Sequence, residues 1–476
     1  MSRRELLTLL GIVILAFFLR IWQLPSTPPG LYPDEAMNGN NALEALKTGE
    51  WRVFYPENNG REGLFINIQA LLLKVTGEQE PWVLRFPSAV FGTLTVLGAF
   101  FLFRELAKFS GFTSPFLVAA AGSFFLATSH WHLIFSRIGF RAIMAPFFLV
   151  WAVYFFLLAV RNQKFRYALL SGASLGLGVY SYIAYRIMPL IFLSFVPTFW
   201  KRRGFWHMAL GFAISAVVVG MPLFSYFLEY PADFLGRTNQ VSIFSSETPL
   251  QDLARNIGVT VGMFLGRGDG NWRHNVAGAP QLFWPVGILF LLGVVVGIRQ
   301  RSLFDVTFFV WLFLAALPVV ISNEGLPHAL RAILMIPAVF AFAGRGAASL
   351  WQYAARHRLA LSKPAALIFL LLMPLHTYFL YFEKWGEHPE TARAFAAEYA
   401  AIGREINALP AEVHKYVVVA APGVDVRGIP MPAQTVMFIT DSFAKEEQER
   451  KRIHYLLPEE YQTRALLPNS RVFILE

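Results

Sequence analysis

Apolar runs separated by short polar connections recur along most of this chain. Runs of about 17 to 21 residues are long enough to cross a bilayer as α-helices, so this pattern predicts a multi-span membrane protein. We expect about eleven spans, of which the fifth and sixth are short. They cover residues 6–22, 83–103, 112–128, 142–160, 167–182, 187–200, 207–228, 282–298, 306–321, 332–348 and 365–382.

Two polar segments between these runs are long enough to have structure of their own, residues 25–82 and 229–281. The first is expected to contain two helices that lie along the membrane surface, Glu35–Lys47 and Leu64–Val75, because the second of these is too short to span. The other segment is polar and has a helical pattern over Pro249–Leu265.

The pattern changes after Phe382. Residues 383–476 begin with an amphipathic helix pattern, Ala392–Leu409, and continue with three β-branched or apolar runs that are candidate strands. These runs are Tyr416–Ala421, Val436–Thr440 and Val472–Leu475. We therefore predict a membrane domain over residues 1–382 and a small soluble α/β domain over 383–476, with enough apolar residues for a modest core.

Composition and charge agree with a membrane protein. The chain is 55% hydrophobic, with a mean hydropathy of +0.47. Its formal net charge of +10 could suggest a nucleic-acid partner, but the basic residues cluster on every second connection, which is the positive-inside pattern. We therefore predict no nucleic-acid binding and a multi-pass protein of the cytoplasmic membrane. Its N-terminus would lie in the cytoplasm, with the segments 25–82 and 229–281 and the C-terminus outside.

Two features limit the chemistry and the processing of the chain. It contains no cysteine, which excludes disulfides and thiolate metal sites. No small-residue cleavage site follows the first apolar run, so we expect that run to remain as the first span.

Adjacent carboxylates follow the first span. Asp34 and Glu35 come directly after Pro33 at a predicted helix start, where acidic side chains face the positive end of the helix dipole. Arg61 and Glu62 close the same segment. Acids are common at helix starts without any chemistry, so a purely structural pair is the alternative interpretation.

Arginines and hydrogen-bonding groups also gather at the outer ends of the spans, where the positive-inside rule predicts few cations. Arg137 and Arg141 are four residues apart and would share one face of a helix. The other outer connections contain Tyr180, Tyr182, Tyr185 and Arg186; Asp269, Asn271, Arg273 and His274; and His328 and Arg331. A single arginine can snorkel to lipid headgroups and tyrosines often form interface belts. Four such connections together favour an anionic ligand, and guanidinium groups bind phosphate bidentately.

Several motifs occur in a fixed order. They are Asp34-Glu35, ENNGRE at 57–62, LRFPS at 84–88, SRIGFR at 136–141, and the stretches 182–186, 268–275 and 323–331. In these motifs the chain resembles the GT-C membrane glycosyltransferases, in the branch of the dolichyl-phosphate-mannose protein mannosyltransferases and the aminoarabinose transferase of lipid A. The resemblance covers residues 5–350. Gly63 replaces the proline of similar bacterial sequences, which would loosen the start of the second surface helix.

The resemblance implies a GT-C helical bundle that moves a sugar, with inversion, from a polyprenyl-phosphate carrier to a protein, glycan or lipid acceptor outside the cytoplasm. By the same resemblance Asp34 is the base, and Glu35 or Glu62 orients the acceptor or a metal. The candidates for the donor phosphate are Arg137, Arg141, Arg186 and Arg331. The candidates for the sugar or acceptor are Arg61, Tyr182, Tyr185, Asp269, Asn271, Arg273, His274 and His328.

No cofactor is predicted with certainty. Asp34, Glu62 and His274 have the oxygen and nitrogen ligands for a divalent metal, but their spacing matches no metal-binding signature.

Two other functions fit part of the pattern. A transporter or lipid flippase for a phosphate-bearing lipid needs polar groups near the bilayer midplane, whereas the span middles here contain few ionisable residues. A non-catalytic anchor for the outer domain leaves the four outer connections unexplained.

Overall fold

The computed structural model describes residues 1–234, 243, 247–322, 325–359 and 362–476. The chain forms two compact units. A helical unit comprises Met1–Trp22, Ser88–Arg137 and Arg141–Lys384. A mixed unit comprises Gln23–Pro87, Ile138–Phe140 and Trp385–Glu476. The C-terminal part of the chain, from Trp385, and most of the segment 25–82 therefore belong to the same unit. The predicted domain boundary between residues 382 and 383 remains a prediction.

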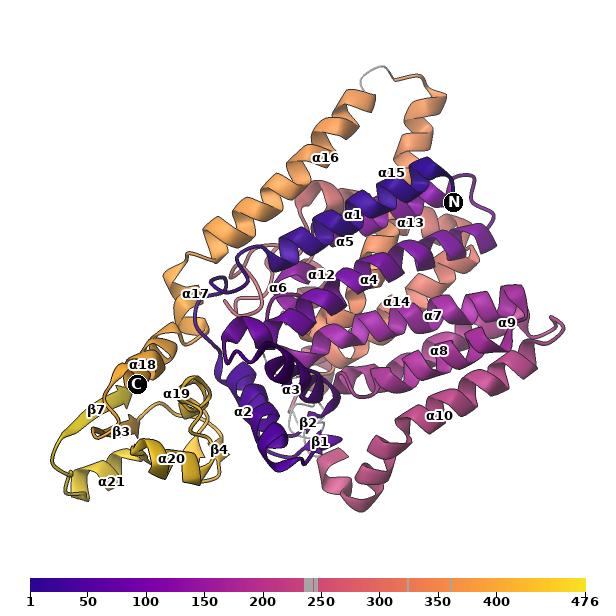
Figure 1. Ribbon diagram of the computed structural model, residues 1–476. Coiled ribbons are helices and arrows are strands. Elements are labelled where there is room, and N and C mark those ends of the chain that lie inside the picture. Colours follow the sequence, from indigo (N-terminus) through magenta and orange to yellow (C-terminus); the bar gives the residue numbers. More distant parts are fainter. Residues whose placement is uncertain (235–242, 244–246, 323–324, 360–361) are drawn as a thin grey trace. The chain divides into compact units, whose positions relative to one another are not determined.

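The helical unit contains the long apolar helices (Figure 1). Within the described residues, six helical stretches are long and apolar enough to cross a membrane: Pro81–Phe109, Arg141–Asn162, Phe205–Glu229, Leu303–Val320, Arg331–Arg356 and Lys363–Trp385. These stretches support the predicted multi-pass membrane protein. The count of eleven spans remains a prediction.

The longer helices of this unit are α1 (Arg3–Ile21), α4 (Pro81–Phe109), α5 (Pro115–Ala127), α7 (Met144–Asn162), α8 (Phe165–Gly178), α10 (Phe205–Glu229), α12 (Pro249–Gly262), α13 (Trp284–Gln300), α14 (Leu303–Val320), α15 (Ile336–Arg356) and α16 (Ser362–Tyr378). The shorter elements are α6 (His130–Phe135), α9 (Val196–Phe199), the 3₁₀ helices η1 (Arg141–Ile143), η2 (Ile183–Phe195) and η4 (Arg331–Met335), and the π-helix η5 (Phe379–Trp385). Helix α12 confirms the helical pattern predicted within residues 229–281.

The predicted sixth span is not a regular α-helix. Residues 183–195 form the 3₁₀ helix η2, and only the four residues of α9 continue it. Pro189 lies inside η2, and a proline cannot donate the backbone hydrogen bond that an α-helix needs. Apolar composition predicted the presence of a helix here, but not its type.

Helices α13 and α15 pack closely because glycines remove the side chains between them. A Cβ atom on Gly346 of α15 would overlap the carbonyl oxygen of Leu289 on α13, and one on Gly293 would overlap that of Phe342. Such close backbone approach is typical of helix pairs in membranes.

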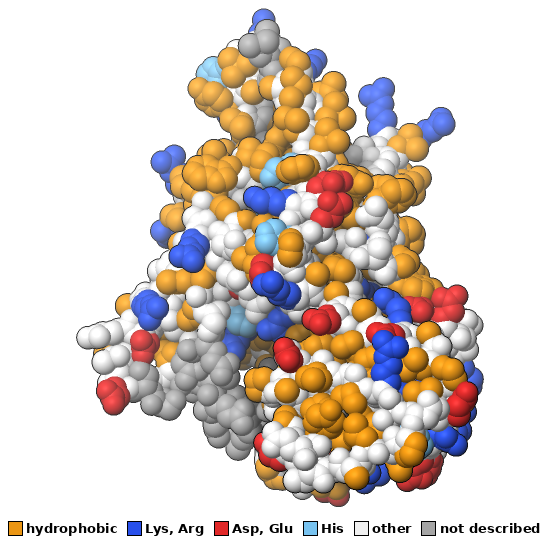
Figure 2. Space-filling model, turned by 90° about the vertical axis from the view of Figure 1, so that its left-hand side faces the viewer, with side chains coloured by type: hydrophobic (Ala, Val, Ile, Leu, Met, Phe, Trp, Pro, Cys, Tyr) orange, Lys and Arg blue, Asp and Glu red, His pale blue; other side chains and the backbone are white. Residues whose placement is uncertain are grey.

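Helix α16 has an apolar surface that other described elements leave exposed. Figure 2 shows hydrophobic side chains around its upper end. Leu367, Ile368, Leu371 and Leu375 are each at least 56% exposed. A helix that is apolar on its outer side is expected to face lipid.

The mixed unit combines a parallel three-stranded sheet with short helices. Strand β3 (His414–Val419) lies between β6 (Ile453–Leu456) and β7 (Ser470–Leu475), and both pairs are parallel. The other elements of the C-terminal part are α17 (Pro389–Ala394), α18 (Ala397–Ala408), α19 (Ala433–Thr440), α20 (Lys445–Lys451), α21 (Pro458–Thr463) and the hairpin of β4 (Asp425–Val426) and β5 (Ile429–Pro430).

One candidate strand is a helix. The run Val436–Thr440 belongs to α19, whose Val436 and Met437 pack in the core of the sheet, while Phe438 packs beside the first outer segment. A helix buried on two sides has an apolar run that resembles a buried strand. The strand that completes the sheet is β6, which follows the charged helix α20.

The first outer segment folds largely as its sequence predicts. It contains α2 (Pro33–Thr48), the short hairpin of β1 (Phe54–Tyr55) and β2 (Arg61–Glu62), and α3 (Leu64–Thr76). Gly49 ends α2 with a φ of 79°, a left-handed conformation that glycine adopts without strain.

Candidate functional site

Glu35 is fully buried and held by an ion pair at the start of α2. Arg85, also fully buried, places its Nε 3.0 Å from Oε1 and its Nη2 3.1 Å from Oε2 of Glu35. The backbone N–H groups of Gly139 and Tyr32 donate to the two oxygens at 2.6 and 3.3 Å. Because both oxygens are occupied in this way, the geometry favours a positioning role for Glu35.

Asp34 differs from its neighbour in exposure. Its side chain is half-buried, and Oδ1 accepts a hydrogen bond of 2.6 Å from Nδ2 of Asn58. Asn58 has a φ of 53° in the turn between β1 and β2, and asparagine tolerates this left-handed conformation better than most residues. Asn58, a neutral partner, therefore orients the carboxylate of Asp34, and this residue is only partly buried at the helix N-terminus.

Arg61 and Glu62 are both buried on β2. The guanidinium of Arg61 donates to the side-chain oxygens of Asn38 at 2.8 Å and Asn41 at 2.6 Å. Arg61 thereby connects the hairpin to α2, and Glu62 is only 2% exposed. This geometry favours support of the hairpin over direct contact with a ligand by these two residues.

The backbone contacts of residue 63 explain why it is glycine and not the proline of similar sequences. Its N–H donates to the carbonyl oxygen of Val53 at 2.7 Å, a bond that proline could not make. A Cβ atom at Gly63 would overlap the carbonyl oxygen of Arg52. Helix α3 begins at Leu64, where the sequence pattern places it. The expected loosening of this helix start stays a prediction.

The C-terminal part of the mixed unit contacts the same hairpin through Arg427. Its guanidinium binds both oxygens of Glu44 on α2, at 2.7 and 3.0 Å, and Oε1 of Glu57 at 2.8 Å. Burial acts to raise the pKa of Glu57, but its hydrogen bonds from Arg427 and from the backbone, together with the charges of Arg427 and Arg61, outweigh burial and lower the pKa overall. Arg427 thus fixes the residue that directly precedes Asn58.

A second group of predicted residues lies in the connections of the helical unit. Asp269 is buried and accepts backbone hydrogen bonds of 2.8 Å from Asn271 and from Ala329. Its Oδ2 is also 3.2 Å from Nδ1 of His274. The rings of His274 and His328 stack with their centroids 4.8 Å apart. The stretches 268–275 and 325–331 are therefore in contact at this point, and their predicted role in ligand binding stays a prediction.

Electrostatics in this group favour an ionised carboxylate and neutral imidazoles. Burial acts to raise the pKa of Asp269, but its hydrogen bonds from His274 and from the backbone lower it overall. Burial lowers the pKa of His274 and lowers that of His328 to about 3. Both histidines are therefore uncharged at neutral pH.

The remaining predicted residues near this group are partly accessible. Arg331 begins η4 and is half-buried, and its backbone N–H lies 3.3 Å from Nδ1 of His328. Arg273 is also half-buried, and its Nε donates to Oδ1 of Asn271 at 3.3 Å.

Arg137 and Arg141 do not share a helix face. Helix α6 ends at Phe135, and Arg141 begins η1 after an irregular segment. Arg137 is fully buried; it donates to the hydroxyl of Tyr381 and to the carbonyl oxygen of Leu19, both at 3.0 Å. Arg141 is half-buried. The spacing argument failed because residues 136–140 contain one glycine and no proline, which is too weak a signal to predict that the helix ends before them.

The connection that contains the tyrosines is mainly packed against protein. Arg186 is half-buried, donates to the carbonyl oxygen of Phe234 at 3.0 Å, and lies over the rings of Phe227 and Phe234. Tyr185 is fully buried, and within the described residues its hydroxyl has no hydrogen-bond partner. Tyr182 is half-buried.

The metal ligands suggested by the sequence are divided between the two units: Asp34 and Glu62 belong to the mixed unit and His274 to the helical unit. Within the part of the chain that the structure describes, three potential ligands converge elsewhere. Asp269, His274 and His328 each have one ligand atom within 4.8 Å of those of the other two. The sequence pattern does not group these three residues, because 60 positions separate Asp269 from Ala329, which pairs with it.

The sequence and the fold both match known proteins. The model of the dolichyl-phosphate-mannose-protein mannosyltransferase family matches residues 64–228. No curated protein sequence matches the chain.

The fold is similar to that of the Archaeoglobus fulgidus oligosaccharyltransferase in its apo form, with a TM-score of 0.55 and 14% identity over 96% of this chain and 65% of that one. The chain thus spans less than two thirds of that relative. The archaeal AglB bound to an inhibitory peptide and a dolichol-phosphate gives a TM-score of 0.54 and 14% identity, over 97% of this chain and 70% of that one.

ArnT from Cupriavidus metallidurans bound to undecaprenyl phosphate gives a TM-score of 0.54 and 12% identity, over 97% of this chain and 91% of that one.

Proposed function

Since the chain has the fold of the GT-C membrane glycosyltransferases, as its sequence motifs predicted, we propose that it transfers a sugar from a polyprenyl-phosphate carrier to an acceptor outside the cytoplasm. The observation that carries this proposal is the contrast between two adjacent acids at the start of α2. Asp34 is only partly buried and accepts a hydrogen bond from Asn58, whereas the carboxylate of Glu35 is buried in an ion pair with Arg85. Two solved proteins of similar fold hold a polyprenyl phosphate, which supports a lipid-phosphate donor.

The proposed reaction breaks the bond between the anomeric carbon and the phosphate oxygen of the carrier. The acceptor hydroxyl attacks from the opposite face, which inverts the configuration, and Asp34 takes its proton. A phosphate leaves without a general acid, provided that cations stabilise its developing charge. One carboxylate is therefore enough, in contrast to the two carboxylates of glycosidases.

Arg141, Arg186 and Arg331 are proposed to bind the carrier phosphate, because their side chains are only partly buried. Arg137 was predicted to join them. We instead propose that it positions α1 and η5, since it is fully buried against Leu19 and Tyr381. Tyr182, Asn271 and Arg273 remain candidates for the sugar or the acceptor.

The phosphate-binding role predicts that replacing Arg141, Arg186 or Arg331 with lysine weakens donor binding by about tenfold. Lysine keeps the charge but loses the planar fork, and one hydrogen bond to a charged group contributes roughly 1.5 kcal/mol or more. The measurement is the affinity of purified protein for a polyprenyl-phosphate sugar, followed by transfer to an acceptor extract. Arg203→Lys, in the connection between α9 and α10, is the control. Parental affinity in all three variants would remove these arginines from the donor site.

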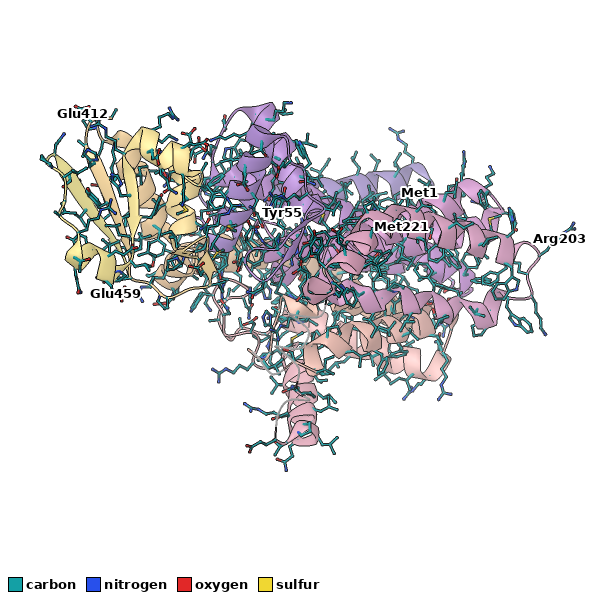
Figure 3. The ribbon with its side chains drawn as sticks, turned by 90° about the horizontal axis from the view of Figure 1, so that it is seen from below. Met1, Tyr55, Arg203, Met221, Glu412 and Glu459 are labelled. Carbon is teal, nitrogen blue, oxygen red and sulfur yellow. The ribbon has the colours of Figure 1, made fainter. Side chains whose placement is uncertain are left out.

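The proposed topology places the connection at residue 203 in the cytoplasm and residue 251 outside. Arg203 is exposed at the end of its connection, with its side chain directed away from the helices (Figure 3). Gln251 is exposed on α12. Because the chain has no cysteine, Arg203→Cys and Gln251→Cys each give a single labelling site. In intact cells an impermeant thiol reagent should label only Gln251→Cys. After lysis both variants should be labelled, which shows that both thiols can react. If both variants or neither are labelled in intact cells, the span count is contradicted.

A further inference from the structure

The turn between β4 and β5 has an arginine where the backbone favours asparagine or glycine. Val426 pairs with Ile429, so Arg427 and Gly428 alone make the turn, and their φ angles are 55° and 88°. Two-residue turns with two left-handed residues are of type I′, and their usual sequence is Asn-Gly. Arginine is disfavoured in this conformation, because its Cβ atom crowds the following carbonyl oxygen. The presence of Arg427 therefore requires a reason outside the hairpin.

The contacts of the Arg427 side chain supply that reason. Its guanidinium lies 4.4 Å from the centroid of the Phe443 ring and donates to Glu44 and Glu57 at distances of 2.7 to 3.0 Å. Glu44 lies on α2, which begins beside Asp34, and Glu57 lies in the connection 56–60 between β1 and β2. One arginine of the C-terminal part of the mixed unit thus holds both elements that surround the proposed base.

The connection 56–60 is a loop that needs such an anchor. Asn58, Asn59 and Gly60 have φ angles of 53°, 61° and 80°, so three successive residues are left-handed. Ordering five loop residues costs more conformational entropy than one hydrogen bond returns. The bond of 2.6 Å from Nδ2 of Asn58 to Oδ1 of Asp34 is therefore too weak to hold the loop by itself.

The two ends of the connection have separate anchors. After its last residue, Arg61 on β2 donates to side chains of α2. Near its start, Glu57 accepts a hydrogen bond of 2.8 Å from Arg427. Loss of Arg427 would release the side chain next to Asn58 and leave the anchor on β2 in place.

We propose that Arg427 is a positioning residue for sugar transfer: through Glu57 it fixes Asn58, which orients the carboxylate of Asp34. A general base acts over hydrogen-bond distance, so a displacement of about 1 Å can slow the reaction by about a hundredfold. This inference rests on the proposed function, because it takes Asp34 as the base. It gives the C-terminal part of the mixed unit a role in catalysis.

Arg427→Asn tests this role and should keep the fold. Asparagine suits a type I′ turn better than arginine, so the hairpin is retained while the contacts with Glu44 and Glu57 are lost. Purified full-length protein is given an isotope-labelled lipid extract of its native cells and an acceptor extract. We expect transfer to slow by roughly tenfold to a hundredfold and the affinity for undecaprenyl phosphate to stay parental. A parental transfer rate, or affinity that falls together with the rate, would overturn the inference.

A double variant tests the route through Asn58. Asn58→Gly permits the left-handed backbone but removes the amide that donates to Asp34. If Arg427 acts through Asn58, adding Arg427→Asn to Asn58→Gly should slow transfer by less than about threefold more, because the two residues act as a unit. Losses that multiply in the double variant would overturn this route.

Lys47→Met is the matched control, because Lys47 also joins α2 to the C-terminal part of the mixed unit. Its Nζ lies 2.7 Å from Oδ1 of Asp441, and the side chains of Lys47 and Arg427 are 43% and 41% exposed. Hydrogen exchange of the segment 54–62 needs no substrate. It should become faster in Arg427→Asn and stay parental in Lys47→Met. Unchanged exchange in Arg427→Asn, or equally slow transfer in Lys47→Met, would overturn the inference.

Asp34→Asn, measured beside these variants, separates the inference from the proposed function. If Asp34→Asn loses transfer and Arg427→Asn keeps it, the inference alone fails. If Asp34→Asn keeps the parental rate, Asp34 is not the base, and the inference fails with that assignment.

Discussion

Replacing Asp34 with asparagine is expected to slow sugar transfer by about two to four orders of magnitude, which is the usual contribution of a general base. The donor should still bind, because the proposed donor contacts are made by other residues. Asparagine has nearly the same size, and its side-chain oxygen can still accept the hydrogen bond that Asn58 donates to Asp34. What the variant loses is the ability to take the proton of the acceptor. The measurements are the transfer rate from a defined polyprenyl-phosphate sugar and the affinity for that donor.

The control for this experiment follows from the structure. Glu35→Gln is not a matched control, because it would leave Arg85 without its buried partner. Glu50→Gln is suitable, because Glu50 is exposed in the same segment and its carboxylate pairs with the exposed Arg52 at 2.8 Å. Such surface pairs contribute little to stability. A parental transfer rate in Asp34→Asn would show that Asp34 is not the base. Loss of donor binding together with transfer would instead indicate that the carboxylate maintains the structure of the site.

The local sequence predicted the elements around Asp34 well. Pro33 pre-sets the backbone of a first helical turn, and α2 begins at this residue. The apolar run after Gly63 likewise forms α3. Failures occurred where distant packing decides the outcome: the run Val436–Thr440 became a helix because it is covered on two faces, and no local signal distinguishes this case from a buried strand.

The different surroundings of the adjacent acids could not be predicted from their positions. Asp34 and Glu35 occupy the same helical turn, and both suit the helix dipole. They differ because Arg85, 50 positions away, and Gly139, 104 positions away, converge on Glu35 alone. Arg61 illustrates the same limit. It was predicted to contact a ligand, and that stays a prediction, but its packing against Asn38 and Asn41 on α2 could not be read from its position.

The buried pair of Glu35 and Arg85 carries the largest expected effect on stability. Arg85→Met keeps most of the apolar length of the side chain but leaves the Glu35 carboxylate buried without its cation. Breaking a buried ion pair by removal of one partner costs about 3–5 kcal/mol. The carbonyl oxygens of Pro28 and Gly30 would also lose their hydrogen bonds from Arg85, of 2.6 and 2.8 Å. We therefore expect the mixed unit to unfold at a clearly lower denaturant concentration, measured by protease sensitivity of the purified protein.

A double variant separates the unpaired charge from the lost packing. Glu35→Gln combined with Arg85→Met removes both charges, so it should be more stable than Arg85→Met alone, because the uncompensated carboxylate is gone. Arg52→Met is the matched surface control; Arg52 pairs with Glu50, but their side chains are 40% and 65% exposed. Its expected cost is therefore no more than about 1 kcal/mol. If the double variant is no more stable than Arg85→Met, the carbonyl hydrogen bonds of Arg85, rather than its charge, hold the start of α2 in place.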